Sequence, residues 1–251
     1  MAGHSKFKNI MHRKGAQDAK RAKIFTKLGR EIIVAAKLGG GDPTSNARLR
    51  LAIQKARQSD MPNDRIKRAI EQGTGAGDAD NYEEVRYEGY GPGGVAVIVE
   101  TLTDNRTRTV AIVREIFSKS GGNMGETNSV AFMFDKIGEI VYPASKAAAD
   151  AMFEAGVEAG AQNVESDSES HIITTDVGDL GTVRDALEKK FGEAERSGFV
   201  WKSNVAAEVS EDQAESVLKM IDKLEDEDDI QSVYTNFEVS DDIMERLAAK
   251  G

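Results

Sequence analysis

The sequence predicts an α+β protein, in which an N-terminal helical bundle is followed by two ferredoxin-like α/β domains. Residues 17–75 hold three stretches with apolar side chains at helical spacing, whereas from residue 82 onward short apolar strands alternate with amphipathic helices. The charge changes sign as well. Residues 1–75 carry 17 Lys and Arg against 6 Asp and Glu, a net +11, and the rest carries 16 against 37, a net −21. The change falls on the Gly-rich segment 73–81, which we expect to be a linker.

Three short helices are expected in the first part of the chain. The first begins at Gln17 and ends at the glycines 39–41, and the second is expected to start with Asp42 as its N-cap and Pro43 as its first residue. The third is expected to end at Gly73. Because amphipathic helices this short cannot bury their apolar stripes alone, they should pack into one bundle.

The order of strands and helices after the linker divides into two units. Residues 137–203 follow the order β-α-β-β-α-β of a ferredoxin-like fold. The flanking segments 95–134 and 204–237 each have the order β-α-β, with strands expected at 130–134 and 205–209, so together they would form a second such unit. We therefore predict three domains. They are a basic arm with a three-helix domain at 1–75, a discontinuous ferredoxin-like middle domain at 82–135 plus 204–251, and an inserted ferredoxin-like domain at 136–203.

The basic end of the chain predicts binding to a polyanion, and nucleic acid is the commonest such partner. Ordinary surfaces intersperse both signs of charge, whereas acidic residues are scarce here, which counts against the alternative of a solvated helix face. Phe7 and Phe25 are the only aromatic residues in 1–75, so phosphate and shape contacts are favoured over base reading. Arg106 and Arg108 are included among the predicted binding residues. Cations at a helix N-terminus oppose the helix dipole, so their position there suggests contact with an anion or with RNA. The predicted nucleic-acid-binding residues are Lys6, Lys8, His12, Arg13, Lys14, Lys20, Arg21, Lys23, Lys27, Arg30, Arg48, Arg50, Arg57, Arg65, Lys67, Arg68, Arg106 and Arg108.

Other motifs give no sign of catalysis. Residues 89–94 match G-x-G-x-x-G, but they precede an apolar strand instead of opening a helix, so we expect a turn between two strands and no nucleotide site. The acidic run 225–229 is expected to be a solvated helix end and not a metal site. Of three His, two lie in the basic arm, and only His171 lies in the acidic part. We expect no enzyme, no cofactor and no metal.

Composition places the protein among non-membrane, cytoplasmic proteins. The chain has no Cys, which excludes a disulfide framework and thiolate chemistry. No apolar run approaches the roughly 18 residues of a membrane helix, and the basic N-terminus is not followed by the apolar region of a secretory signal. We expect no membrane association. A monomer is favoured, and the acidic remainder is available to a protein partner.

Long segments resemble the YebC/PmpR family. They are residues 1–32, the stretch AAKLGGGDPTSNARLRLAI at 35–53, residues 87–125 and the late segment DDIQSVYTNFEVSDD. The resemblance implies a helical N-terminal domain, two α/β domains and no catalytic residues. For bacterial members it implies a DNA-binding transcriptional regulator in the cytoplasm.

The family also implies an alternative function. Its mitochondrial relative activates translation of cytochrome c oxidase subunit I, and some bacterial relatives are associated with relief of ribosome stalling at proline-rich stretches. The sequence thus predicts a non-enzymatic, nucleic-acid-binding regulator of gene expression, acting on DNA in transcription. The alternative is a ribosome-associated translation factor that binds ribosomal RNA.

Overall fold

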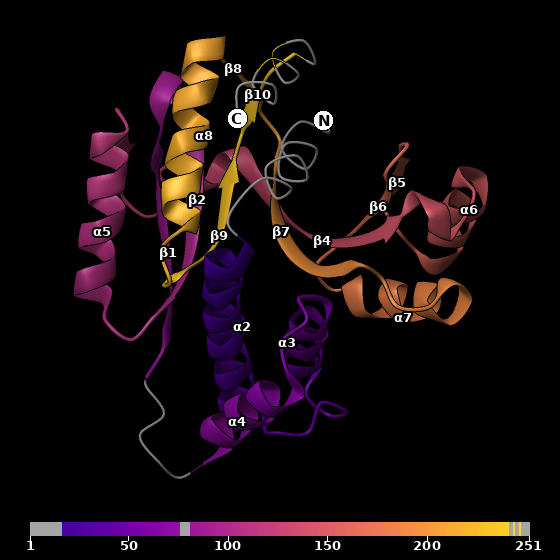
Figure 1. Ribbon diagram of the computed structural model, residues 1–251. Coiled ribbons are helices and arrows are strands. Elements are labelled where there is room, and N and C mark those ends of the chain that lie inside the picture. Colours follow the sequence, from indigo (N-terminus) through magenta and orange to yellow (C-terminus); the bar gives the residue numbers. More distant parts are fainter. Residues whose placement is uncertain (1–16, 76–80, 241–242, 244–245, 247–251) are drawn as a thin grey trace. The chain divides into compact units, whose positions relative to one another are not determined.

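The computed structural model describes residues 17–75, 81–240, 243 and 246, with side chains from Arg21 onward (Figure 1). The contacts divide the chain into two units. Unit 1 comprises Met1–Phe134 and Ser203–Gly251, and unit 2 comprises Asp135–Lys202. Helices and largely antiparallel sheets confirm the predicted α+β class. The three-domain division stays a prediction, and residues 76–80 of the expected linker lie outside the described residues.

A three-helix bundle forms the first part of unit 1. It consists of α2 (Gln17–Gly39), α3 (Ala47–Gln58) and α4 (Asn63–Thr74), and α2 packs against both of the others (Figure 1). Helix α2 ends at Gly39 as predicted, and Gly40 follows with φ of 84°. The buried apolar side chains of the bundle are those of Ile32, Ile33, Ala35, Ala36, Leu49, Ala52, Ile53, Ala56, Met61, Ile66 and Ala69.

Helix α3 begins later than predicted. Asp42 caps no helix, because its carboxylate accepts hydrogen bonds from the backbone nitrogen and the Oγ1 atom of Thr44 and closes a turn. The N-cap is the buried Asn46, whose side chain accepts a hydrogen bond from the backbone nitrogen of Leu49 at 3.0 Å. Its Nδ2 atom donates to the carbonyl oxygen of Ala35 at 2.7 Å. Asn46 therefore joins the start of α3 to α2, a contact that capping preferences alone do not reveal.

Gly73 was expected to end α4, but the helix continues to Thr74. Gly73 is instead buried against α2. A Cβ atom at this position would lie 2.4 Å from the carbonyl oxygen of Ile33 and 2.8 Å from the Cβ atom of Ala36. The absent side chain is therefore what allows the two helix backbones to come so close.

The Gly73→Ala substitution is expected to lower the free energy of unfolding by roughly 1–3 kcal/mol, because the methyl group forces α2 and α4 apart. Urea unfolding at equilibrium measures the effect. Gly178→Ala is the matched control, since a Cβ atom there meets nothing within 4 Å. An equal change in both variants would show that crowding against α2 is not the cause.

A four-stranded antiparallel sheet forms the second part of unit 1, with strand order β3-β1-β2-β9. The strands are β1 (Glu83–Tyr90), β2 (Ala96–Thr103), β3 (Asn123–Met124) and β9 (Ile230–Thr235). Helices α5 (Arg106–Lys119) and α8 (Glu211–Glu225) cover one face of it (Figure 1). The core between sheet and helices includes Val97, Val99, Val113, Phe117, Val217, Met220, Ile221, Leu224 and Val233.

Two segments that were predicted as strands of this sheet do not belong to it. Residues 130–134 form a 3-10 turn, η2 (Ala131–Met133), and only Phe134 is extended. The segment 205–209 contributes β8 (Ala207–Glu208), which pairs in parallel with β10 (Phe237–Glu238) outside the four-stranded sheet.

Strand β3 takes the place in the sheet that was assigned to 130–134, and strand β1 takes the place that was assigned to 205–209. Strand β1 pairs antiparallel with both β2 and β3. The resulting strand order is that of a ferredoxin-like sheet, in which β1 occupies the position of the third strand of the β-α-β-β-α-β order. This strand comes from the start of the domain and not from the segment before α8.

The Gly-rich segment 89–94 is a turn between β1 and β2, as predicted, and contains the short 3-10 turn η1 (Pro92–Gly94). It lies against a second Gly-rich segment at the end of α5. A Cβ atom on Gly122 would lie 2.4 Å from the carbonyl oxygen of Tyr90. The glycine pattern thus serves close backbone packing.

Unit 2 has the order β-α-β-β-α-β, and its sheet order is β5-β6-β4-β7, as in a ferredoxin-like fold. Its elements are β4 (Phe134–Pro143), the 3-10 turn η3 (Ala144–Lys146), α6 (Ala149–Ala159), β5 (Asn163–Ser166), β6 (Ser170–Thr175), α7 (Leu180–Phe191) and β7 (Arg196–Ser203). His171 is buried in this sheet. Its Nδ1 atom is hydrogen-bonded to the hydroxyl group of Ser166 at 2.7 Å, and its Nε2 atom donates to the carbonyl oxygen of Ala147 at 3.0 Å. His171 is therefore a structural residue.

Candidate nucleic-acid interface

Two lysines of α2 contact the acidic loop, which we define as residues 225–229 at the end of α8. The Nζ atom of Lys23 lies 2.6 Å from a carboxylate oxygen of Asp226 and 3.2 Å from its carbonyl oxygen. Lys27 donates to the carbonyl oxygen of Glu225. Burial lowers the pKa of Lys27 by more than the surrounding acidic side chains raise it. Because the last carbonyl groups of a helix are partly negative and lack helical partners, the lysines complement the end of α8.

Asp229 is the centre of a buried polar network. Its carboxylate accepts from Arg30 at 2.6 Å, from Arg108 at 2.8 Å and from the hydroxyl group of Thr109 at 2.7 Å. Burial alone would raise the pKa of Asp229, but the hydrogen bonds from Arg108, Thr109 and Arg30 outweigh it and lower the pKa. The network therefore joins α2, α5 and the acidic loop around one carboxylate.

The acidic loop is thus more than the solvated helix end expected from the sequence. Its carboxylate and carbonyl oxygens hold three of the predicted nucleic-acid-binding residues, Lys23, Lys27 and Arg30. A fourth, Arg108, is held by Asp229 and also by Asp104 at 2.7 Å.

Arg48 also has acidic partners within unit 1. Its Nε and Nη2 atoms lie 2.9 and 3.2 Å from the two carboxylate oxygens of Glu31, and Nη2 also contacts Glu84. Burial would lower the pKa of Arg48, but these hydrogen bonds and charges raise it. Arg106 lies 3.7 Å from Glu83, and both side chains are exposed, so this contact is weak.

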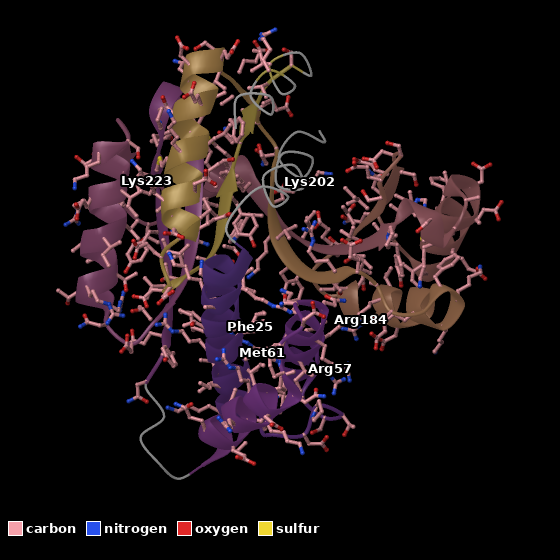
Figure 2. All side chains as sticks on the ribbon, viewed as in Figure 1. Phe25, Arg57, Met61, Arg184, Lys202 and Lys223 are labelled. Atoms are coloured by element: carbon pink, nitrogen blue, oxygen red, sulfur yellow. The ribbon has the colours of Figure 1, made fainter. Side chains whose placement is uncertain are left out.

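Phe25 is covered by two cations. The guanidinium carbons of Arg21 and Arg65 lie 5.7 and 5.6 Å from the centre of its ring. Such cation–π contacts are favourable, and they leave the ring less open to a nucleic-acid base. Arg21 also pairs with Asp60 at 3.3 Å, where both side chains are largely exposed. Figure 2 shows Phe25 together with Met61, which packs in the same core.

Four predicted cations of the bundle remain, and we call them the α3–α4 cations: Arg50, Arg57, Lys67 and Arg68. All four are exposed, and Figure 2 shows Arg57 on α3. Within the part of the chain that the structure describes, none of them has an acidic partner. These side chains can therefore reach a phosphate without first breaking a contact inside the protein.

Comparison with known proteins gives the family. The profile of the TACO1/YebC protein N-terminal domain matches residues 5–76, and that of the TACO1/YebC second and third domain matches residues 82–237. The chain belongs to the TACO1/YebC family. The second profile is named for transcriptional regulation. A crystal structure of a conserved hypothetical protein from Aquifex aeolicus is similar, with 43% sequence identity and a TM-score of 0.84, over 91% of this chain and 94% of that chain.

The TACO1/YebC matches confirm the resemblance predicted from the sequence. They do not test individual residues of the predicted interface. Within the basic arm, the predicted residues Lys6, Lys8, His12, Arg13 and Lys14 lie outside the described residues, as does the side chain of Lys20.

Sequence reasoning missed a buried carboxylate in this TACO1/YebC chain. Glu88 accepts hydrogen bonds from the backbone nitrogens of Asn128, Val130 and Ala131 at 3.0, 3.0 and 2.9 Å, and from Arg86 at 2.9 Å. Burial alone would raise the pKa of Glu88, but these hydrogen bonds outweigh it, so the pKa is lowered. They also explain why the start of 130–134 is no strand, since the N–H groups of Val130 and Ala131 are already used. In 83–90 polar residues alternate with Val85 and Tyr87, so the sequence pattern carried no signal that Glu88 is buried.

Among the residues that the structure describes, no group of three or more His, Cys, Asp and Glu side chains could hold a metal ion. No helix in the described ranges is long and apolar enough to cross a bilayer.

Proposed function

We propose that this protein is a non-enzymatic regulator of gene expression that acts in the cytoplasm and binds DNA to regulate transcription. The observation that carries the proposal is the set of α3–α4 cations, which are exposed and have no acidic partner among the described residues. The name of the matching family profile supports transcription as the process.

The proposed contact is with the phosphate backbone. Helices α3 and α4 are joined by a short turn at 59–62, the type of connection found in helix-turn-helix proteins. The α3–α4 cations are Arg and Lys, which neutralise phosphates and release counterions. Such contacts fix the position of a protein on a duplex, and they carry little sequence information themselves.

Replacing the α3–α4 cations by Gln is expected to weaken binding to a duplex of about 30 base pairs by roughly tenfold or more at low salt. The slope of log affinity against log salt should become shallower by about 0.9 for each phosphate that the variant no longer neutralises. Fluorescence anisotropy at salt concentrations of about 50 to 200 mM measures both quantities.

The matched control removes four exposed cations elsewhere, Arg114, Lys146, Lys189 and Lys223, and changes the net charge equally. It should keep the salt slope of the parent protein. If both variants bound equally weakly, net charge and not the α3–α4 surface would control binding.

A second candidate function is that of a translation factor that binds ribosomal RNA. The observation in its favour is that Phe25, the one aromatic residue among the described residues 17–75, is covered by Arg21 and Arg65 and so is less available to stack on a base. Phosphate contacts alone suit RNA as well as DNA. Crosslinking in cells followed by sequencing of the attached nucleic acid separates the two. Promoter DNA would support transcription, whereas ribosomal RNA or tRNA would support translation.

A further inference from the structure

We propose that the acidic loop is an internal substitute for nucleic-acid phosphates, which occupies the cations of α2 until nucleic acid displaces it. The inference rests on the proposed function and adds a form of regulation to it. On this view α2 belongs to the same binding surface as the α3–α4 cations, but is blocked in the free protein.

The cations involved form one stripe on α2. Lys23, Lys27 and Arg30 follow one another at spacings of four and three residues, so they lie on the same side of the helix. Every contact they make with the acidic loop is to a carboxylate or carbonyl oxygen. A phosphate group offers the same kind of acceptor with a full negative charge. The cations of the stripe are therefore chemically suited to bind phosphate oxygens in place of those of the loop.

The contacts differ in how readily they can be exchanged. The side chains of Lys23 and Asp226 are 40% and 63% exposed, and such ion pairs contribute little in water and weaken with salt. The side chains of Arg30 and Asp229 are only 16% and 8% exposed, and Asp229 is also held by Arg108 and Thr109. The release should therefore begin at Lys23, while Arg30 keeps the loop attached.

A purely structural role makes a different prediction. If the lysines serve only to satisfy the end of α8, then weakening the loop should leave nucleic-acid affinity unchanged. If the loop competes with phosphate, weakening it should raise affinity, because a larger fraction of the protein is then able to bind.

The first test is the double substitution Asp226→Asn with Asp228→Asn, which leaves Asp229 intact. Affinity for a duplex of about 30 base pairs and for purified ribosomal RNA is measured by anisotropy at about 50 mM salt. The control is Asp150→Asn with Glu154→Gln on α6, two exposed acids whose removal changes the net charge equally. We expect a roughly 3- to 10-fold gain beyond the control. The same affinity in both variants would overturn the inference.

The second test follows the contact directly. The chain has no Cys, so Ala22→Cys with Lys223→Cys provides two unique positions for spin labels, one on α2 and one in the last turn of α8. Addition of saturating duplex or ribosomal RNA should lengthen the distance between the labels, as measured by double electron–electron resonance. Binding with an unchanged distance would overturn the inference and leave the proposed function standing. No binding to either probe would overturn both.

Discussion

The Glu88→Gln substitution is expected to lower the free energy of unfolding by about 3–5 kcal/mol. The carboxylate accepts three backbone N–H groups and the Arg86 guanidinium in a buried position. An amide of the same size has only one oxygen, and its NH₂ group faces N–H donors. At least one buried donor then has no partner, and Arg86 loses its counter-charge. Urea unfolding at equilibrium measures the change.

Two further measurements make the Glu88 prediction specific. Glu126→Gln, an exposed position in the loop that contacts Glu88, should change stability little. The parent protein should also lose stability as pH falls below the ordinary Glu value of 4.5, because the folded-state pKa of Glu88 is lowered. The Glu88→Gln variant should lack that part of the acid dependence. An unaltered pH profile would show that Glu88 is not the responsible carboxylate.

The Asp229→Ala substitution is expected to destabilise the protein by about 3–5 kcal/mol, since it removes one partner of a largely buried ion pair. Arg30 and Arg108 would both lose their shared acceptor, and the hydroxyl group of Thr109 would lose a bond of 2.7 Å. The attachment between α2 and the sheet would weaken with it. Thermal unfolding and amide hydrogen exchange on α2 report the two effects.

The matched control for Asp229 is its neighbour Asp228. Asp228 is exposed, and it contacts Arg30 through its carbonyl oxygen, which a side-chain substitution leaves in place. Asp228→Ala should therefore change stability little. Equal destabilisation in the two variants would mean that the acidic loop acts through its net charge and not through the Asp229 network.

Features set by neighbouring residues were predictable from the sequence. Ser210 and Gln213 have the spacing of a capping box in the sequence, and helix α8 starts there, with the side chain of each residue bonded to the backbone of the other. The turn at 89–94 was also predictable, because the glycines precede an apolar strand. In both cases the chemistry that decides the structure lies within a few residues.

Features set by distant residues were not predictable. The apolar residues 130–134 have a strand pattern, but Glu88, from another part of the chain, accepts hydrogen bonds from the N–H groups of Val130 and Ala131. The acidic run 225–229 resembles a solvated helix end until α2 is placed beside it. Charge composition correctly showed that the basic end is unusual. It could not show which of its cations already have partners inside the protein.

The sheet of unit 1 combines strands from early and late parts of the chain, and this affects how the protein folds during synthesis. The hairpin of β1 and β2 and the helix α5 leave the ribosome early, but the other neighbour of β2 is β9, near the end of the chain. Until α8 and β9 emerge, the apolar side chains of Val97, Val99 and Phe117 lack much of their cover. Unit 2, whose strands are contiguous in sequence, can complete its own fold during that interval. The nascent chain therefore passes through a stage with one finished unit and one incomplete, aggregation-prone sheet.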